Sequence, residues 1–212
     1  MAKNDPGGCC RCCCSFVVTS GLTALFMWLS LRTSYPTCSI EQFYVPALDN
    51  STDNHTIFFD LRLANRMKDK GVRYNNITLT FLYEGKGPSS INIANYTVKG
   101  FYQGHKKKAH RAELVQTTGV PWSEAIAAVS NNVSTVNFGV QLATRVKFKI
   151  MFWYTKWYRL AVSADIAVGG GGQKVNKKGE GIKLTSRAPD RGWRWARFSL
   201  TVISIIFAIF ML

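Results

Sequence analysis

The fold of this chain is decided by Arg145–Val168, which reads RVKFKIMFWYTKWYRLAVSADIAV. Apolar and polar residues alternate through its first part, a pattern typical of a β-strand with one buried face. Thr155-Lys156 then predicts a short turn. A second alternating run follows over Trp157–Val168, with its apolar residues on one face. The stretch therefore predicts a β-hairpin and, with it, a protein built from antiparallel strands.

The same alternation recurs on the N-terminal side of this hairpin. It predicts further strands over Gln42–Ala47, Thr56–Ala64, Ile77–Tyr83, Ile91–Val98, Ala112–Gln116 and Val133–Leu142. A short helix is predicted over Pro121–Val129, because proline suits the first turn of a helix. Several short antiparallel strands in a segment of about 150 residues are typical of one sandwich domain. The sequence thus predicts an all-β fold, an antiparallel β-sandwich of immunoglobulin or fibronectin III type, over residues 38–185.

Two hydrophobic segments flank the predicted domain. Ser15–Leu31 would span about 25 Å as a helix and about 30 Å with the three preceding cysteines, close to the thickness of a bilayer core. It predicts a transmembrane signal anchor over residues 15–31, with a cleaved signal peptide as the alternative. Lys3 and Arg11 outweigh Asp5 before it, which favours a cytosolic tail over residues 1–14.

The second hydrophobic segment, Phe198–Leu212, is too short for a comfortable span, at about 22 Å. It follows a polar spacer, Pro189–Arg197, and the small residue Ser186. A small attachment residue, a spacer and an apolar tail make up a GPI-attachment signal. Residues 186–212 are therefore expected to direct GPI attachment at Ser186, or else to form a C-terminal membrane segment.

Five sequons for N-glycosylation lie between the two hydrophobic segments. They begin at Asn50, Asn54, Asn76, Asn95 and Asn132. Because N-glycans are added only in the secretory lumen, this distribution predicts an extracellular domain at the plasma membrane.

The first hydrophobic segment is preceded by a cluster of cysteines. Its members are Cys9, Cys10, Cys12, Cys13 and Cys14. Adjacent cysteines do not easily surround one tetrahedral metal ion, so no metal site is expected. Thiols beside a membrane anchor are instead candidates for palmitoylation, with free thiols as the alternative. Cys38 stands alone beyond the anchor, as the partner in an intermolecular disulfide of a homo-oligomer or as an unpaired thiol.

The chain is strongly basic, with 27 Lys and Arg against 12 Asp and Glu and a net charge of +15. The densest cluster is GHKKKAHR, residues 104–111. The anion-binding candidates in it are His105, Lys106, Lys107, Lys108 and Arg111. Outside a cell such a cluster would meet anionic headgroups or acidic wall polysaccharides rather than nucleic acid, unless it is simply a solvated loop.

No motif for catalysis appears in the sequence. It contains neither Gly-x-Ser-x-Gly nor His-Glu-x-x-His, and no phosphate-binding loop. The three histidines have no evident nucleophile or carboxylate partner. We therefore expect no enzymatic activity and no cofactor.

Several motifs resemble the plant non-race-specific disease resistance and harpin-induced-like family, whose domain is the group-2 late embryogenesis abundant type. Its motifs match the cysteine cluster with its apolar segment, the stretch Phe43–Leu48, Lys68–Tyr74, and Phe-Tyr-Gln-Gly-His at residues 101–105. The resemblance implies a β-sandwich at the plasma membrane that acts in pathogen-triggered signalling and in contact between membrane and cell wall. We further expect the short cytosolic tail, residues 1–14, to meet a membrane-tethered immune regulator.

Two departures from the family pattern are visible. Ala64-Asn65-Arg66 stands where members commonly have Asn-Pro-Asn, and Gly169–Gly172 stands where close relatives carry an adhesion motif, Asn-Gly-Asp. The second departure argues against adhesion through that loop. Two alternatives to signalling stay open: a structural protein that protects membrane–wall contact under stress, and a lipid-binding sandwich.

Overall fold

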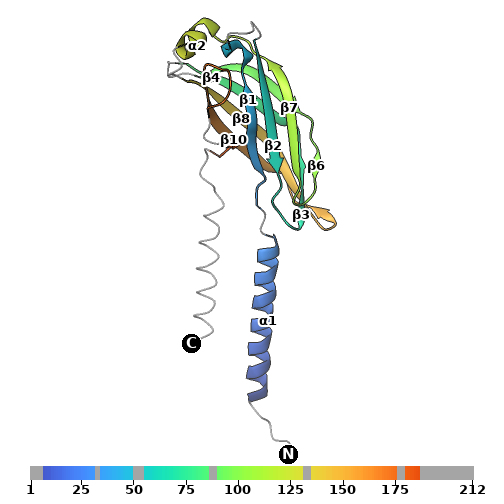
Figure 1. Cartoon of the computed structure of the whole chain (residues 1–212). Coiled ribbons are helices and arrows are strands. Elements are labelled where there is room, and N and C mark those ends of the chain that lie inside the picture. The colour runs from blue at the N-terminus through green and yellow to red at the C-terminus, as the bar shows by residue number, and fades with distance from the viewer. Residues whose placement is uncertain are drawn as a thin grey trace, which may run out of the picture. The chain divides into compact units, whose positions relative to one another are not determined.

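A computed structural model of the chain describes residues 7–31, 34–49, 55–85, 90–130, 135–175 and 180–186. The chain divides into two compact units, Met1–Ser34 and Tyr35–Leu212. A helix makes up the described part of the first unit, and the described strands all belong to the second (Figure 1).

The first unit is built around α1, an α-helix over Gly7–Leu31. The helix begins eight residues before Ser15, so the cysteine cluster lies on it. Large apolar side chains along α1 are exposed, among them Phe16 and Phe26. Over the residues for which the structure gives a description, no helix is long and apolar enough to span a bilayer.

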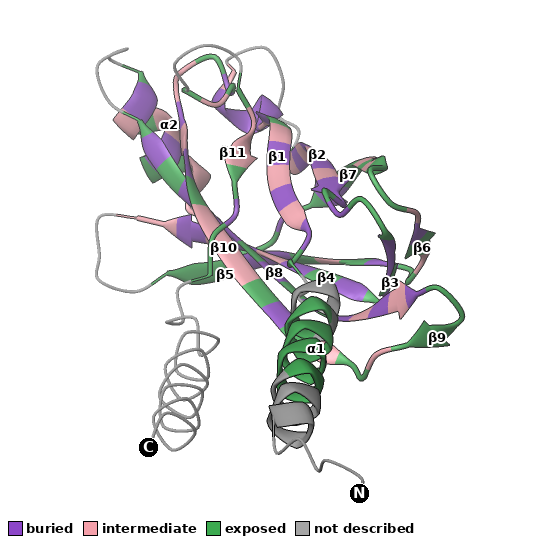
Figure 2. Ribbon diagram, turned by 90° about the horizontal axis from the view of Figure 1, so that it is seen from below, coloured by how far each residue is buried: buried purple, intermediate pink, exposed green. Residues whose placement is uncertain are grey.

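The first sheet of the second unit has four antiparallel strands in the order β11-β1-β2-β7. These are β11 (Ile182–Lys183), β1 (Thr37–Tyr44), β2 (Thr56–Ala64) and β7 (Lys108–Gln116). Apolar residues of β2 occupy every second position and are buried, as the alternation predicts. Figure 2 shows the same alternation of buried and partly buried residues along β1.

The second sheet has seven antiparallel strands, of which five follow the order β5-β4-β8-β3-β6. These five are β5 (Ile91–Val98), β4 (Ile77–Glu84), β8 (Val136–Ile150), β3 (Lys70–Tyr74) and β6 (Tyr102–Gln103). The other two, β9 (Trp153–Tyr154) and β10 (Tyr158–Val168), both pair with β8. The 15 residues of β8 join two segments that the sequence predicted as separate strands.

Aromatic side chains from the two sheets meet in one hydrophobic core. Phe59 of β2 lies 5.1 Å from Phe81 of β4, measured between ring centroids, and Phe43 of β1 lies 5.8 Å from Phe138 of β8. The prediction of an all-β protein with antiparallel sheets is therefore confirmed. The strand orders give no support to the immunoglobulin or fibronectin III assignment.

The predicted hairpin is present, but its turn lies elsewhere. The chain reverses at Met151 and Phe152, since Ile150 pairs with Trp153. Thr155 still pairs with the strand, because its amide donates to the Phe148 carbonyl at 2.9 Å. Tyr158 then pairs with Val146, so two residues oppose one and form a bulge where the turn was predicted.

Short elements complete the domain. A 3-10 helix, η1, spans Pro46–Leu48, and α2 spans Trp122–Val129, in agreement with the predicted short helix. Strand β3 was not predicted, because its five residues are nearly all buried and show no alternation. In Figure 1, α2 and the end of β3 lie at opposite ends of the domain.

Candidate functional site

The predicted anion-binding cluster forms a tight loop between β6 and β7. We call His105–Lys108 the basic loop. All four of its side chains are exposed. Lys106 adopts a positive φ of 53°, which allows the sharp reversal between the two strands. The structure therefore places four of the five predicted residues side by side in solvent.

Two buried amide side chains hold the basic loop in shape. The Gln103 Nε2 donates to the carbonyls of Leu63 and Lys107, both at 2.9 Å, and its Oε1 accepts from the Tyr74 hydroxyl at 2.8 Å. The Asn65 Nδ2 donates to the Gly104 carbonyl at 3.0 Å. Because these groups are buried, the network fixes the backbone beneath the lysines.

Arg111, the fifth predicted residue, does not join the basic loop. It pairs with Leu61 of β2 and so lies on the core-facing side of the edge strand, opposite to Lys108 and His110. Its guanidinium carbon sits 4.8 Å from the centre of the Phe101 ring, a cation–π contact. Their closeness in the sequence suggested that all five residues form one cluster. Because side chains alternate between the two faces of β7, Arg111 lies on the opposite face from Lys108.

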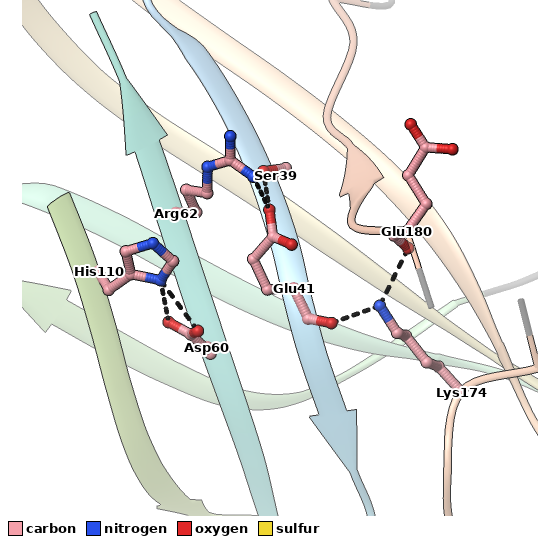
Figure 3. A network of polar contacts seen from close by, with 7 residues as sticks. All are labelled: Ser39, Glu41, Asp60, Arg62, His110, Lys174 and Glu180. Carbon is pink, nitrogen blue, oxygen red and sulfur yellow. Dashed lines mark hydrogen bonds and ion pairs between the residues drawn. The ribbon is translucent and has the colours of Figure 1, made fainter. Parts of the chain in front are cut away.

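The outer face of the first sheet carries a network of polar contacts (Figure 3). Arg62 donates to the Glu41 carboxylate at 2.9 Å, and His110 lies 3.1 Å from the Asp60 carboxylate. Partial burial acts to raise the pKa of Glu41, but hydrogen bonds from Ser39 and Arg62 outweigh it and leave the pKa below its ordinary value. Both carboxylates of this face are thus engaged with neighbouring side chains.

Cys38 is a free, buried thiol within β1. Loss of solvation raises its pKa to about 12, so the reactive thiolate is suppressed. Of the two roles left open by the sequence, the structure favours the unpaired thiol over the intermolecular disulfide.

Two of the five sequons lie within the described residues, and both are exposed. Asn95 lies on the edge strand β5. Asn76 precedes β4, and its Oδ1 accepts a hydrogen bond from the Gly100 amide at 3.1 Å. Asn50, Asn54 and Asn132 lie outside the described residues, as do the side chains of the cysteine cluster. Ser186 is exposed, and the rest of the expected GPI signal again falls outside the described part.

The glycine run at residues 169–172 forms an ordered turn rather than a flexible loop. The Gly172 amide donates to the Gly169 carbonyl at 2.9 Å, and the Val45 amide donates to the Gly172 carbonyl at 2.8 Å. Gly172 has a φ of +68°, and a Cβ atom there would collide with the Val45 carbonyl oxygen. The turn therefore requires glycine at this position.

A pocket of about 280 Å³ opens beside β10 and β11. Its lining residues are Ser163, Ala164, Asp165, Ile182, Lys183 and Thr185. This lining is mostly polar, so the pocket does not favour the tail of a lipid.

The sequence reading missed a group of exposed aromatic residues around the turn of the long hairpin. Phe152 is 89% exposed, and Lys147 lies 4.5 Å from the centre of the Tyr154 ring. The alternation assigned Phe152 to the buried face of a strand, although it lies in the turn. The signal that could have found this group is the density of Trp, Tyr, Phe and Lys in residues 147–158.

Fold and site together define a class: a two-sheet β-domain preceded by an apolar helix, with an ordered basic loop at one end. No family model matches the chain. The chain is, however, 47% identical over 190 residues to Protein NDR1 of Arabidopsis thaliana, covering 85% of this chain and 85% of that protein. The chain belongs to the plant non-race-specific disease resistance family, as its motifs suggested.

A solution structure of a late embryogenesis abundant (LEA) protein is also similar. The match covers 73% of this chain and 85% of the chain of that protein, with a TM-score of 0.30 and 11% sequence identity. A similarity this low supports no conclusion about the fold or the function of this chain.

Proposed function

We propose that the chain is a plasma-membrane component of plant disease resistance that acts without enzymatic activity. The observation that carries the proposal is its 47% identity to Protein NDR1 over most of both chains. Family membership supports a role in disease resistance, whereas fold alone would not specify one.

Membrane attachment is the second part of the proposal. Helix α1 exposes large apolar side chains, and the cysteine cluster belongs to the same helix, where acyl chains would add to its affinity for a membrane. The exposed sequons at Asn76 and Asn95 support an extracellular position for the sheets. Residues 186–212 would supply GPI attachment at Ser186, and residues 1–14 would meet a cytosolic immune regulator.

The basic loop is the proposed contact with an anionic partner outside the cell. Its lysines project into solvent from a backbone that buried amides hold in place. A fixed cluster of like charges attracts headgroups or acidic wall polysaccharides through a long-range, salt-dependent field.

Complementation of a plant that lacks this protein tests the proposal. A triple variant, Lys106→Gln, Lys107→Gln and Lys108→Gln, removes the charges and keeps the length of the side chains. We expect full-length wild type to restore resistance, measured as pathogen growth in leaves, and the triple variant to restore less. A Lys99→Gln and Lys183→Gln variant, changed at exposed sites outside the loop, serves as the control.

Two outcomes would count against the proposed function. Unaltered pathogen growth in the knockout would overturn the role in disease resistance. Full resistance with the triple variant would remove the basic loop from the proposal and leave the family role standing.

A further inference from the structure

The turn between β8 and β9 presents apolar side chains to solvent. Met151 is 73% exposed, Phe152 89% and Trp153 58%. Turns are usually formed by small polar residues, whereas this turn consists of Met151 and Phe152 and is followed at once by Trp153 of β9. Such a protruding apolar tip indicates a surface that is covered in use.

Lysines surround the aromatic rings behind this tip. Lys147 lies 4.5 Å from the centre of the Tyr154 ring and 4.7 Å from that of Trp157. Lys149 lies 5.9 Å from the centre of the Tyr102 ring. These are cation–π distances, and they hold the ammonium groups beside the exposed rings.

The strands next to the tip concentrate positive charge on the outer face of the second sheet. Lys147 pairs with Arg73, and Arg145 pairs with Arg159. Lys156, in the bulge, adds a further exposed cation. Asp69, just before β3, lies 4.0 Å from Lys70. The face beside the tip is therefore cationic as well as aromatic.

The tip and the basic loop lie at the same end of the domain. Ile150 pairs with Lys70 at the start of β3, and the Lys106 amide donates to the Met67 carbonyl at 3.1 Å, just before that strand. Tyr35, the first residue of the domain, lies 6.4 Å from Phe148 between ring centroids. Three residues separate Tyr35 from the end of α1, a gap that an extended chain spans with about 14 Å.

We propose that this end of the domain docks on the surface of an anionic phospholipid bilayer. Met151, Phe152 and Trp153 enter the interfacial layer, where amphipathic and apolar rings are stable. Lys147, Lys149 and the basic loop contact the phosphate groups. The inference rests on the proposed membrane attachment of α1, which would hold the docking end within reach of the bilayer.

A bilayer fits this surface better than an acidic polysaccharide does. Sugars stack on the open faces of Tyr and Trp rings, but Lys147 already lies over both Tyr154 and Trp157. The most exposed residues, Met151 and Phe152, offer no polar atom to a sugar hydroxyl except a weak thioether acceptor. Apolar groups at the outermost point are instead suited to insertion among lipids.

Hydrogen exchange of the full-length chain in lipid nanodiscs tests the docking. The discs contain phosphatidylcholine, with or without phosphatidylserine. We expect backbone amides of residues 145–157 to exchange more slowly in the anionic discs only, and those of α2, at the other end, to be unaffected. A Lys147→Gln and Lys149→Gln variant should reduce the docking equilibrium constant about 30-fold, and a Lys99→Gln and Lys183→Gln variant should not.

Equal exchange in neutral and anionic discs would overturn the docking while leaving α1 as an anchor. Protection of the same residues by soluble polygalacturonate but not by anionic discs would assign the surface to polysaccharide. If the full-length chain does not enter discs, the anchor proposal fails. Sedimentation of the chain with anionic vesicles then tests the docking without the anchor, and no sedimentation would overturn it. A Phe152→Ser variant that docks as wild type does would exclude insertion of the tip.

Discussion

Single side chains determine whether the basic loop has a defined shape. Gln103 is buried and connects three backbone or side-chain groups from β2, β3 and the loop itself. The exposed lysines add charge, but they contribute little to the position of the backbone. The residue that matters most for the geometry of the candidate site is thus one that no ligand would touch.

Replacement of Gln103 by alanine is expected to destabilise the domain by about 3 kcal/mol. The change leaves the Tyr74 hydroxyl and the Leu63 carbonyl without this buried partner, at about 1–3 kcal/mol for each group, whereas the Lys107 carbonyl still accepts from the Asn65 amide at 3.0 Å. The free energy of unfolding in denaturant measures the effect. Gln141→Ala, an exposed change on β8, is the matched control, with an expected effect within about 0.5 kcal/mol. Equal effects of both variants would show that the network does not stabilise the loop.

Gly172 is a second residue whose backbone decides a local structure. We expect Gly172→Ala to destabilise the domain by more than about 1 kcal/mol, because φ is positive and the new methyl group meets the Val45 carbonyl. Gly171→Ala, where a Cβ atom has no neighbour within 4 Å, should have little effect. Thermal unfolding of the two variants compares the positions, and a Gly172→Ala protein as stable as wild type would contradict the strained turn.

At the scale of elements, paired charges join neighbouring strands on the solvent side of the first sheet. Glu41 on β1 and Arg62 on β2 lie 2.9 Å apart, with side chains 21% and 29% exposed respectively. Solvent screens such a pair, so its contribution to stability is small. Its pH dependence is nevertheless specific, because the pKa of Glu41 is lowered in the folded state.

Acid should therefore weaken the contact between β1 and β2. A lowered folded-state pKa means that Glu41 stabilises the fold at pH above its ordinary value of 4.5 and that this contribution is lost as pH falls through the lower, folded value. Chemical denaturation between pH 7 and pH 3 is expected to show a shallower loss of stability for Glu41→Gln than for wild type. Parallel curves for the two proteins would show that the carboxylate is not stabilised by its partners.

At the scale of the whole molecule, the proposed extracellular position of the sheets can be tested by which surfaces carry glycans. Asn76 and Asn95 are both exposed and both belong to the second sheet or its border. The apolar tip of the same sheet, Met151 to Trp153, is expected to face lipid. An occupied sequon and a docked tip are compatible because they occupy different positions along the sheet.

Each exposed sequon is expected to carry one glycan when the full-length chain is made in plant cells. Asn76→Gln and Asn95→Gln should each lower the apparent mass by the mass of one glycan. Glycosidase treatment of wild type should remove at least these two glycans. Asn137→Gln, at an exposed asparagine outside any sequon, is the control. Unchanged mass in both variants, with no response to glycosidase, would contradict the extracellular position.

Patterns local to the chain predicted the strands well. The bounds of β2 and β5 agree with the alternating runs, and the buried faces of Val146, Phe148 and Leu160 follow from a period of two. The turn of the long hairpin was misplaced, since a bulge at Lys156 and Trp157 cannot be told from a turn by alternation alone. Separating Arg111 from Lys108 required knowing that β7 begins at Lys108. The first residues of β7 include lysine and histidine, so they do not show an alternation of apolar and polar residues.

The class of fold, the family and the chemistry of the basic loop could be predicted from the chain alone, because each depends on residue type and spacing. Which groups share a surface became visible in three dimensions. Gln103 meets Leu63, and Lys106 meets Met67, through long-range pairing of strands. The aromatic tip lies at the same end of the domain as the basic loop for the same reason. Pairing between distant segments sets such neighbourhoods, and local periodicity carries no information about it.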